Sequence, residues 1–263
     1  MKPRLLAVLL VAALVPAAMS AKIISKPVAY THGGVALEGW LAYDDSRTGV
    51  RPGVLVVPEW WGLNDYIKGR AQQLAEMGYV AFAVDMYGKG VNTEDPKRAG
   101  ELAGQFYGKP LMAERARAAL DQLLQTGLVD PKKVAAIGFC FGGSTCQALA
   151  FSGAPLAGIV SFHGGLVPVP AGAEHGIRIL MLNGAADPFI KPEQITAFKQ
   201  AMESGHYRWK WVDYAGALHA FTNPNADRIK AIHPEMSGIG YNEAAATGSW
   251  KEMQAFFTEL FHG

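Results

Sequence analysis

Continuous apolar runs and stripes of apolar residues at helical spacing alternate along most of this chain. Residues 53–58, 79–85 and 134–139 are almost entirely apolar, as strands covered on both faces are. Residues 35–43 instead alternate between apolar and polar side chains, which predicts an antiparallel strand at an edge of the sheet. Three later runs complete the set of expected strands: 156–162, 177–182 and 207–214.

Between the strands, apolar residues recur at the spacing of amphipathic helices. The clearest helix covers residues 64–77, with Asn64 as its N-cap and Gly78 closing it. Asp130 and Pro131 are expected to turn the chain into the strand at 134–139. This alternation predicts a mostly parallel central sheet with helices on both faces, whose active site lies at the carboxyl ends of the strands. The other expected helices are 96–107, 110–125, 192–204 and a C-terminal stripe of Trp250, Met253, Phe256, Phe257 and Leu260.

A cysteine directly follows the strand at 134–139, where the pattern changes from strand to helix. Gly138, Cys140 and Gly142 match G-x-C-x-G, the cysteine form of the nucleophile elbow, in which glycines avoid a clash with crowded backbone. Such a turn lifts the side chain above the sheet at a helix N-terminus, whose dipole favours a thiolate. The alternative is that Cys140 is a small buried hydrophobic residue beside glycines that match by chance.

Two further chemically useful residues follow later strands. Asp187 lies after the strand at 177–182 and His219 after the strand at 207–214. The chain order Cys140, Asp187, His219 is that of the catalytic triad in the α/β-hydrolase fold. In that arrangement His219 would take the thiol proton, and Asp187 would hold the imidazole in the required tautomer. Taken singly, Asp187 could open a turn and His219 could be an ordinary loop histidine.

The loop after the strand at 53–58 holds further candidates. An oxyanion needs fixed donors, and we expect the backbone N–H groups of Phe141 and Trp60 to supply them. Glu59 is either an exposed loop acid or a buried acid beside the thiol. Trp60 and Trp61 are expected to wall the pocket or to cover the sheet edge.

With these residues in place, the sequence resembles the dienelactone hydrolase family of α/β hydrolases. The matching segments are VVPEWWG, VDMYG, IGFCFGG, NGAADPFIKP and YAGALHAF, which together span residues 53–221. The resemblance implies the α/β-hydrolase fold, a Cys-His-Asp triad and hydrolysis of esters or lactones. It also implies that Glu59 contacts the resting thiol and helps to ionise it when substrate enters.

The sequence departs from the best-known members where they hold a substrate carboxylate with two arginines. After the D-x-Y strand, Lys89 is the only cation, and no arginine follows His219 closely. Lysine is a poorer clamp for a planar carboxylate. We therefore expect another small ester, lactone or thioester as substrate. The candidate substrate-binding residues are Trp61, Tyr87, Lys89 and Phe221.

The first residues differ from the rest of the chain. Basic Lys2 and Arg4 precede an apolar stretch and small residues, which predicts a signal peptide over residues 1–21 and a periplasmic or secreted protein. An uncleaved membrane anchor is the alternative, although the stretch is short for a span. Residues 22–263 are expected to form a single α/β-hydrolase domain without a stable membrane anchor, as a monomer or small homo-oligomer.

Composition and sequence motifs limit the classes of partner and cofactor that are expected. Without Lys2 and Arg4, 22 basic residues face 23 acidic ones, so the remainder has a formal charge of −1 and gives no reason to expect nucleic acid as a partner. No phosphate loop or dinucleotide fingerprint appears, so we expect no cofactor. Four histidines lack metal-ligand spacing, so no metal is expected. They are His32, His175, His206 and His233.

Other assignments remain open from the sequence. Cys146, the second cysteine, lies six residues along the same expected helix, too far to bridge to Cys140. His163 also ends a strand but precedes Asp187, so His219 is preferred as the base. A serine hydrolase using Ser144 or Ser161 lacks an elbow. A thioesterase and a non-catalytic thiol-sensing or binding protein on the same fold are the alternatives to an ester or lactone hydrolase.

Overall fold

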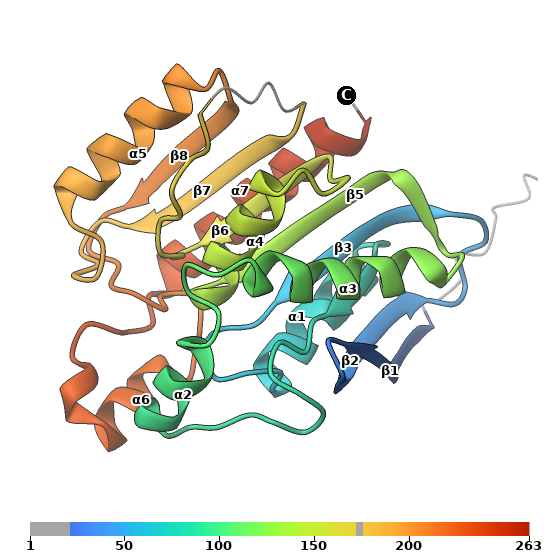
Figure 1. Ribbon diagram of the computed structural model, residues 1–263, viewed down its shortest axis with the longest axis horizontal. Coiled ribbons are helices and arrows are strands. Elements are labelled where there is room, and N and C mark those ends of the chain that lie inside the picture. Colours follow the sequence, from blue (N-terminus) through green and yellow to red (C-terminus); the bar gives the residue numbers. More distant parts are fainter. Residues whose placement is uncertain (1–21, 172–175, 263) are drawn as a thin grey trace, which may run out of the picture.

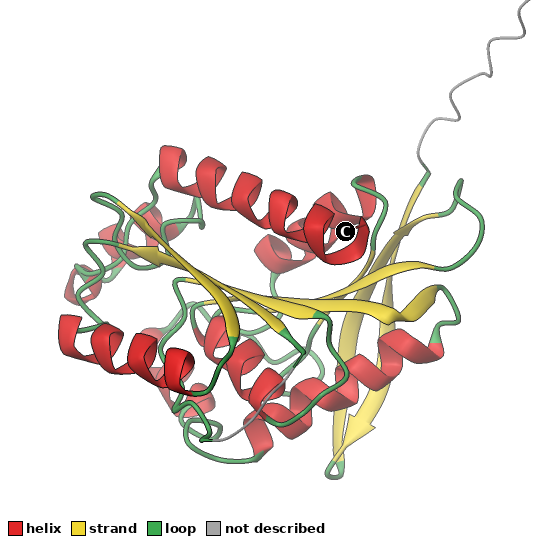
Figure 2. Cartoon of the chain, turned by 90° about the horizontal axis from the view of Figure 1, so that it is seen from above, coloured by secondary structure: helices red, strands yellow, loops and turns green. Residues whose placement is uncertain are grey.

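An eight-stranded sheet runs through the centre of the protein, with helices on both faces (Figures 1 and 2). The computed structural model describes residues 22–171 and 176–262. The strand order is β1-β2-β4-β3-β5-β6-β7-β8; β1 and β2 are antiparallel to their neighbours, and the rest are parallel. The strands are β1 (Ile23–His32), β2 (Val35–Asp44), β3 (Arg51–Val57), β4 (Val80–Ala83), β5 (Val129–Phe139), β6 (Gly158–Phe162), β7 (Arg178–Gly184) and β8 (Arg208–Tyr214).

The central strands are apolar throughout because both of their faces are covered. Along β3, Val54 and Val56 belong to the core on one face, while Leu55 and Val57 belong to the core on the other. Helices α1 and α7 pack on the first face, and α3, α4 and α5 pack on the second. The helices are α1 (Asp65–Glu76), α2 (Pro96–Ala103), α3 (Leu111–Gln125), α4 (Phe141–Phe151), α5 (Pro192–Ser204), α6 (Ala226–Ile232), the 3-10 turn Pro234–Met236 and α7 (Glu243–His262).

The predicted α/β-hydrolase fold is confirmed, two local predictions are corrected, and some elements were not predicted. Strand β2 is not an edge, because β1 pairs along its whole length and takes the outer position. The turn expected at Asp130 and Pro131 is absent, because both residues already lie within β5, which begins at Val129. The pairing of β5 with β3 is irregular there, with a register shift between Arg51 and Gly53. Helix α6 and the 3-10 turn were not predicted, because they are short and carry no clear apolar period.

The predicted signal peptide over residues 1–21 lies outside the described residues. In the part of the chain that the structure describes, no helix combines the length and the apolar character needed to cross a membrane.

Candidate active site

Cys140 occupies a strained turn between β5 and α4. Its backbone has φ 54° and ψ −116°, a conformation that residues other than glycine rarely adopt. A Cβ on Gly138 would overlap the Gly142 carbonyl, and one on Gly142 would overlap the Val57 carbonyl, so both positions require glycine. The backbone N–H of Cys140 donates to the Phe162 carbonyl at 3.0 Å and to His163 Nδ1 at 3.1 Å. The turn is therefore a nucleophile elbow in its local geometry.

His219 and Asp187 meet at the carboxyl ends of β8 and β7. The Nδ1 atom of His219 lies 2.7 Å from Asp187 Oδ2, and both side chains are buried. Asp187 Oδ1 accepts the Phe189 backbone N–H at 2.9 Å, so this carboxylate both shapes its own turn and holds the imidazole. Because Nδ1 is engaged by the carboxylate, Nε2 of His219 is the nitrogen left to face other groups.

The charge on His219 depends on its neighbours more than on its burial. Burial lowers the pKa of His219, but the negative charge of Cys140 and hydrogen bonds with Asp187 and Cys140 outweigh it and raise the pKa to about 10. The groups that face His219, rather than its burial, therefore determine the direction in which its pKa moves.

Glu59 is a buried acid in the loop after β3 and is only 2% exposed. Its Oε2 accepts the Asn223 side-chain amide at 2.6 Å, while Oε1 is buried without a hydrogen-bond partner. Burial raises the pKa of Glu59 to about 7, although the Asn223 hydrogen bond and the charges of His219 and Arg70 act in the opposite direction. This carboxyl group can thus change its charge close to neutral pH.

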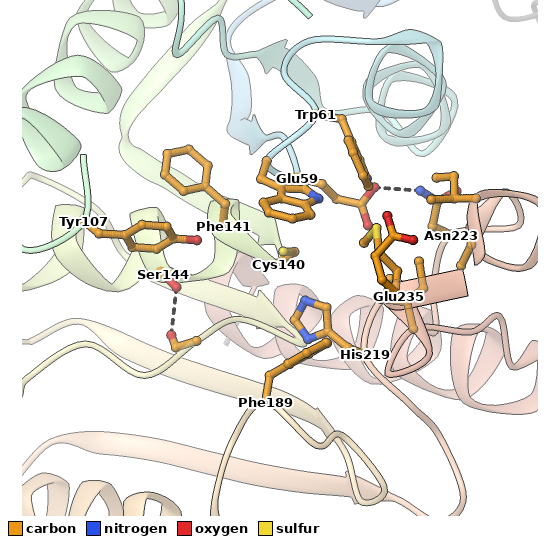
Figure 3. Close-up of a pocket in the computed structure, with 17 residues that line it drawn as sticks. Glu59, Trp61, Tyr107, Cys140, Phe141, Ser144, Phe189, His219, Asn223 and Glu235 are labelled. Carbon is orange, nitrogen blue, oxygen red and sulfur yellow. Dashed lines mark hydrogen bonds between the residues drawn. The ribbon is translucent and has the colours of Figure 1, made fainter. Parts of the chain in front are cut away.

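These groups face one cavity of about 360 Å³, and Figure 3 shows Glu59, Cys140 and His219 around it. Aromatic and aliphatic side chains form most of its wall. The lining residues are Glu59, Trp60, Trp61, Tyr107, Cys140, Phe141, Ser144, Gly165, Phe189, His219, Ala220, Asn223, Ala226, Ile229, Glu235, Met236 and Ile239.

Two residues that line the cavity have backbone N–H groups available for an incoming ligand. Phe141 is the first residue of α4, so its N–H has no acceptor within the helix. Trp60 lines the same cavity from the loop after β3. Neither N–H has a hydrogen-bond acceptor among the described residues.

Of the four candidate substrate-binding residues, only one lines the cavity. Trp61 lines the cavity, whereas Tyr87, Lys89 and Phe221 do not belong to its lining. Tyr87 donates its hydroxyl to the Trp60 carbonyl at 2.9 Å, so it supports that loop. Lys89 pairs with Glu38 at 2.8 Å. Phe221 is fully buried with its ring edge against His163.

Sequence reasoning missed most of the outer part of the cavity. Tyr107 follows α2 and packs edge-on against Phe141. Phe189 packs edge-on against His219. The segment with α6 and the 3-10 turn closes over the cavity and returns at Ile239, where the His219 N–H donates to the Gly238 carbonyl. The D-P-F motif could have drawn attention to Phe189, but nothing in the local pattern marks the other contacts.

Both cysteines are free, and Cys146 is buried in α4. Within residues 22–171 and 176–262, no group of three or more His, Cys, Asp or Glu side chains is arranged to hold a metal ion.

Comparison with known proteins agrees with this architecture. A Yersinia pestis protein that carries the provisional name carboxymethylenebutenolidase is 28% identical over 243 residues, which cover 88% of this chain and 85% of that protein. The crystal structure of a dienelactone hydrolase-like promiscuous phosphotriesterase from metagenomic libraries is similar with a TM-score of 0.86 and 38% identity, covering 92% of this chain and 99% of the other. The ferulic acid esterase of Streptomyces cinnamoneus shares the fold, with a TM-score of 0.67 and 16% identity over 94% of this chain and 92% of its own.

The model of the dienelactone hydrolase family matches residues 37–261, which hold the whole sheet from β2 onward and every group described above. This protein therefore belongs to the dienelactone hydrolase family and is a hydrolase of that class.

Proposed function

We propose that the protein cleaves small carboxylic esters or lactones through a triad of Cys140, His219 and Asp187. The observation that carries the proposal is the position of His219. Its Nδ1 is held by Asp187 at 2.7 Å, and the same ring interacts with the Cys140 thiol in one cavity. We take this arrangement of a nucleophile, a base and a group that orients the base as support for covalent catalysis.

The reaction begins when the Cys140 thiolate attacks the carbonyl carbon of the ester. A carbon–sulfur bond forms, and the carbonyl oxygen becomes an oxyanion, for which we assign the N–H groups of Phe141 and Trp60 as donors. As the intermediate collapses, the carbon–oxygen bond to the alcohol breaks and the imidazolium of His219 gives the leaving oxygen its proton. The product of this half-reaction is an acyl-cysteine.

Deacylation reverses these roles. His219, now neutral, takes a proton from water while the water oxygen attacks the acyl carbon. The tetrahedral intermediate releases the acid and the Cys140 thiolate, and the thiolate and imidazolium are restored. Asp187 stabilises the positive ring at each stage and prevents it from turning over.

Glu59 is placed to adjust the charge around the thiol. Glu59 lines the cavity, its Oε1 has no hydrogen-bond partner, and its pKa of about 7 allows it to hold a proton near neutral pH. A protonated Glu59 can donate a hydrogen bond to the resting sulfur, whereas an ionised Glu59 repels a thiolate. The side chain thus acts on the readiness of Cys140 to attack.

The cavity wall favours substrates without charge. Trp60, Trp61 and Ile229 offer apolar surface to an acyl or alkyl group, and Glu235 adds a carboxylate at the same cavity. Lys89, the cation that could have held a substrate carboxylate, is paired with Glu38 instead. We therefore propose uncharged esters and lactones as the preferred class.

The test uses purified protein, an activated ester such as p-nitrophenyl acetate, and two cysteine variants. Cys140→Ala is expected to lose turnover, and Cys146→Ala, which alters a buried residue outside the cavity, is expected to keep it. Rapid quenching and mass spectrometry should detect an acyl group on Cys140. Equal turnover by wild type and Cys140→Ala would refute the mechanism. Reversible oxidation of Cys140 without any acyl turnover would support a thiol sensor instead.

The substrate panel should also contain a thioester and a phosphotriester. A thioester presents the same acyl carbon with a better leaving group, so a thioesterase is the alternative within this mechanism. A phosphotriester is included because a relative of 38% identity is named for that activity. The relative kcat/KM values rank the three classes.

We also propose that residues 1–21 direct export to the periplasm or beyond the cell and are then removed. Fractionation of producing cells, followed by N-terminal sequencing of the mature chain, tests this. Retention of residue 1 in cytosolic protein would exclude it.

A further inference from the structure

His163, at the end of β6, binds the backbone of the nucleophile rather than its sulfur. Its Nδ1 accepts the Cys140 N–H at 3.1 Å, and its Nε2 lies 2.7 Å from Thr222 Oγ1. Because Nδ1 accepts a hydrogen bond, it carries no proton, and the neutral ring must be protonated at Nε2. Nε2 therefore donates to the Thr222 hydroxyl, and the direction of both bonds is fixed.

The hydrogen bonds continue from Thr222 to Tyr66 and Arg70. Since Thr222 Oγ1 accepts from His163, its own proton goes to the Tyr66 oxygen at 2.9 Å. The Tyr66 hydroxyl donates to the Thr222 carbonyl at 3.1 Å, and Arg70 donates to that carbonyl at 2.9 Å and to Tyr66 at 3.3 Å. Arg70 Nε is buried without a hydrogen-bond partner, so the satisfied part of this network is the set of bonds that joins His163, Thr222 and Tyr66.

Thr222 belongs to the same loop as two groups of the active site. It follows His219 by three residues and immediately precedes Asn223, the hydrogen-bond donor to Glu59. The bond between His163 and Thr222 thus connects the elbow that carries Cys140 to the loop that carries His219. No other described side chain bonds to both the Cys140 backbone and this loop.

The surroundings of His163 keep it neutral. The ring is 1% exposed, with the Phe139 and Phe221 rings beside it and the His219 ring at 5.2 Å. Burial, then the positive charges of His219 and Arg70, hold its pKa well below the ordinary range. A second proton would also place an N–H against the Cys140 N–H and break that bond.

Backbone strain is the reason why the bonds from His163 to Cys140 and Thr222 matter. Cys140 and His163 both have positive φ, at 54° and 40°, and such residues persist only where their surroundings hold them. We propose that His163 is a positioning residue, whose paired bonds to the Cys140 N–H and to Thr222 keep the strained elbow and the His219 loop at the separation that thiol-to-imidazole proton transfer requires. The inference rests on the proposed function, because it assigns Cys140 and His219 to the reaction.

The test measures alkylation of Cys140 by iodoacetamide, with the site of reaction read by mass spectrometry. This readout reports the thiolate directly and needs no ester. His163→Asn tolerates positive φ and can still accept the Cys140 N–H, but it is too short to reach Thr222. Thr222→Val breaks the same connection from the other side. We expect alkylation at pH 6 to slow about tenfold in both variants, with rates converging above pH 9 where any thiol ionises.

Kinetics of ester cleavage add a second readout. A misplaced elbow slows acylation without changing the cavity wall, so kcat should fall about 10- to 100-fold while KM stays within about twofold. Thr222→Ser retains the hydroxyl and should restore both readouts. Thr126→Val, which removes a hydroxyl bonded to the Leu123 carbonyl at the end of α3, is the matched control and should leave both unchanged.

Melting temperatures and circular dichroism of each variant show whether it is folded. Folded Thr222→Val and His163→Asn proteins with the wild-type pH profile of alkylation and wild-type kcat would overturn the inference. Equal loss in Thr222→Ser and Thr222→Val would also overturn it, because the hydroxyl would then be irrelevant. If wild type cleaves no ester, the proposed function fails, but the alkylation profiles still decide the role of His163.

Discussion

Two histidines lie at the same edge of the sheet with their rings 5.2 Å apart, and the protein gives them opposite properties. His163 follows β6 and His219 follows β8, and both are buried. His163 bonds to a backbone N–H and a hydroxyl, and its pKa is lowered by burial and by the charge of His219. His219 bonds to Asp187 and interacts with Cys140, and its pKa is raised to about 10.

The difference shows that burial alone does not decide the charge of a histidine. Burial opposes the imidazolium at both sites, so neighbouring groups determine which ring becomes charged. At His219 the interactions with Asp187 and Cys140 overcome the cost of burial, whereas both hydrogen-bond partners of His163 are neutral groups. Pairs of titratable groups with separated pKa values divide tasks in this way, and under the two proposals above one ring moves protons while the other holds the elbow.

The largest effect is expected when the charged ring is removed. His219→Gln takes away the proton acceptor and should lower kcat/KM for p-nitrophenyl acetate by at least about 10³-fold, far more than the loss expected for His163→Asn. Steady-state kinetics of both purified variants make the comparison. If His163→Asn lost more activity than His219→Gln, the two roles would have to be exchanged.

A smaller effect should follow when His219 keeps its ring but loses its carboxylate. Asp187→Asn removes the negative charge and the fixed tautomer, so the pKa of His219 should fall and kcat should drop about 100-fold. NMR titration of the ring and steady-state kinetics measure the two changes. Asp213→Asn, at the end of β8 outside the cavity, is the control. An unchanged His219 titration in Asp187→Asn would contradict the assigned cause.

Glu59 extends the comparison of the two histidines to a buried acid, whose charge is expected to affect stability as well as activity. Its pKa of about 7 lies above the ordinary value of 4.5, so the folded protein holds a proton that the unfolded chain has lost. The cost to stability is absent below about pH 4.5, grows as the pH rises and is complete above pH 7, at roughly 3 kcal/mol. Glu59→Gln should therefore stabilise the protein at pH 8 but hardly at pH 4.5, while reducing activity.

Urea unfolding of wild type and Glu59→Gln at the two pH values measures this difference. Exposed Glu76, on α1, provides the control as Glu76→Gln. A gain from Glu59→Gln that is the same at both pH values would show that the buried charge is not its origin.

The smallest effect is expected from a charge that remains in water. Glu235 reaches the cavity, but its side chain is 66% exposed, so its field is weakened by solvent. Glu235→Lys should raise kcat/KM for an ester with a free carboxylate about two- to fivefold relative to an uncharged ester of equal length. The ratio should fall toward one in high salt. An increase that persists in high salt would point to a contact other than charge.

Several elements of the fold could be predicted because their signals are local. The apolar strands β3, β4 and β5 and helix α5 are recognisable from adjacent residues alone. The prediction of β2 as an edge strand was wrong although a local signal was present, because β1 pairs with β2 in a hairpin that turns at Gly33 and Gly34. Helix α6 was missed because it is stabilised by the wall of the cavity rather than by its own pattern.

The candidate site divides in the same way. Cys140, Asp187 and His219 each follow a strand, so topology alone brings them to one edge. Lys89 was a candidate for the substrate because it is a cation near a strand end, yet its partner is Glu38. Tyr107 carries no local signal, because it reaches the cavity through its contact with Phe141.

The sequence by itself determined the sheet of alternating strands and helices, the cysteine elbow and the order of the three chemical groups, because each depends on residues close together in the chain. Only the tertiary structure decided that the pKa of His219 is raised while that of His163 is lowered, that Glu59 is buried with one oxygen lacking a hydrogen-bond partner, and that Thr222 connects the elbow to the His219 loop. Charge and position at these sites depend on neighbours that are distant in sequence, and only folding brings those neighbours into contact.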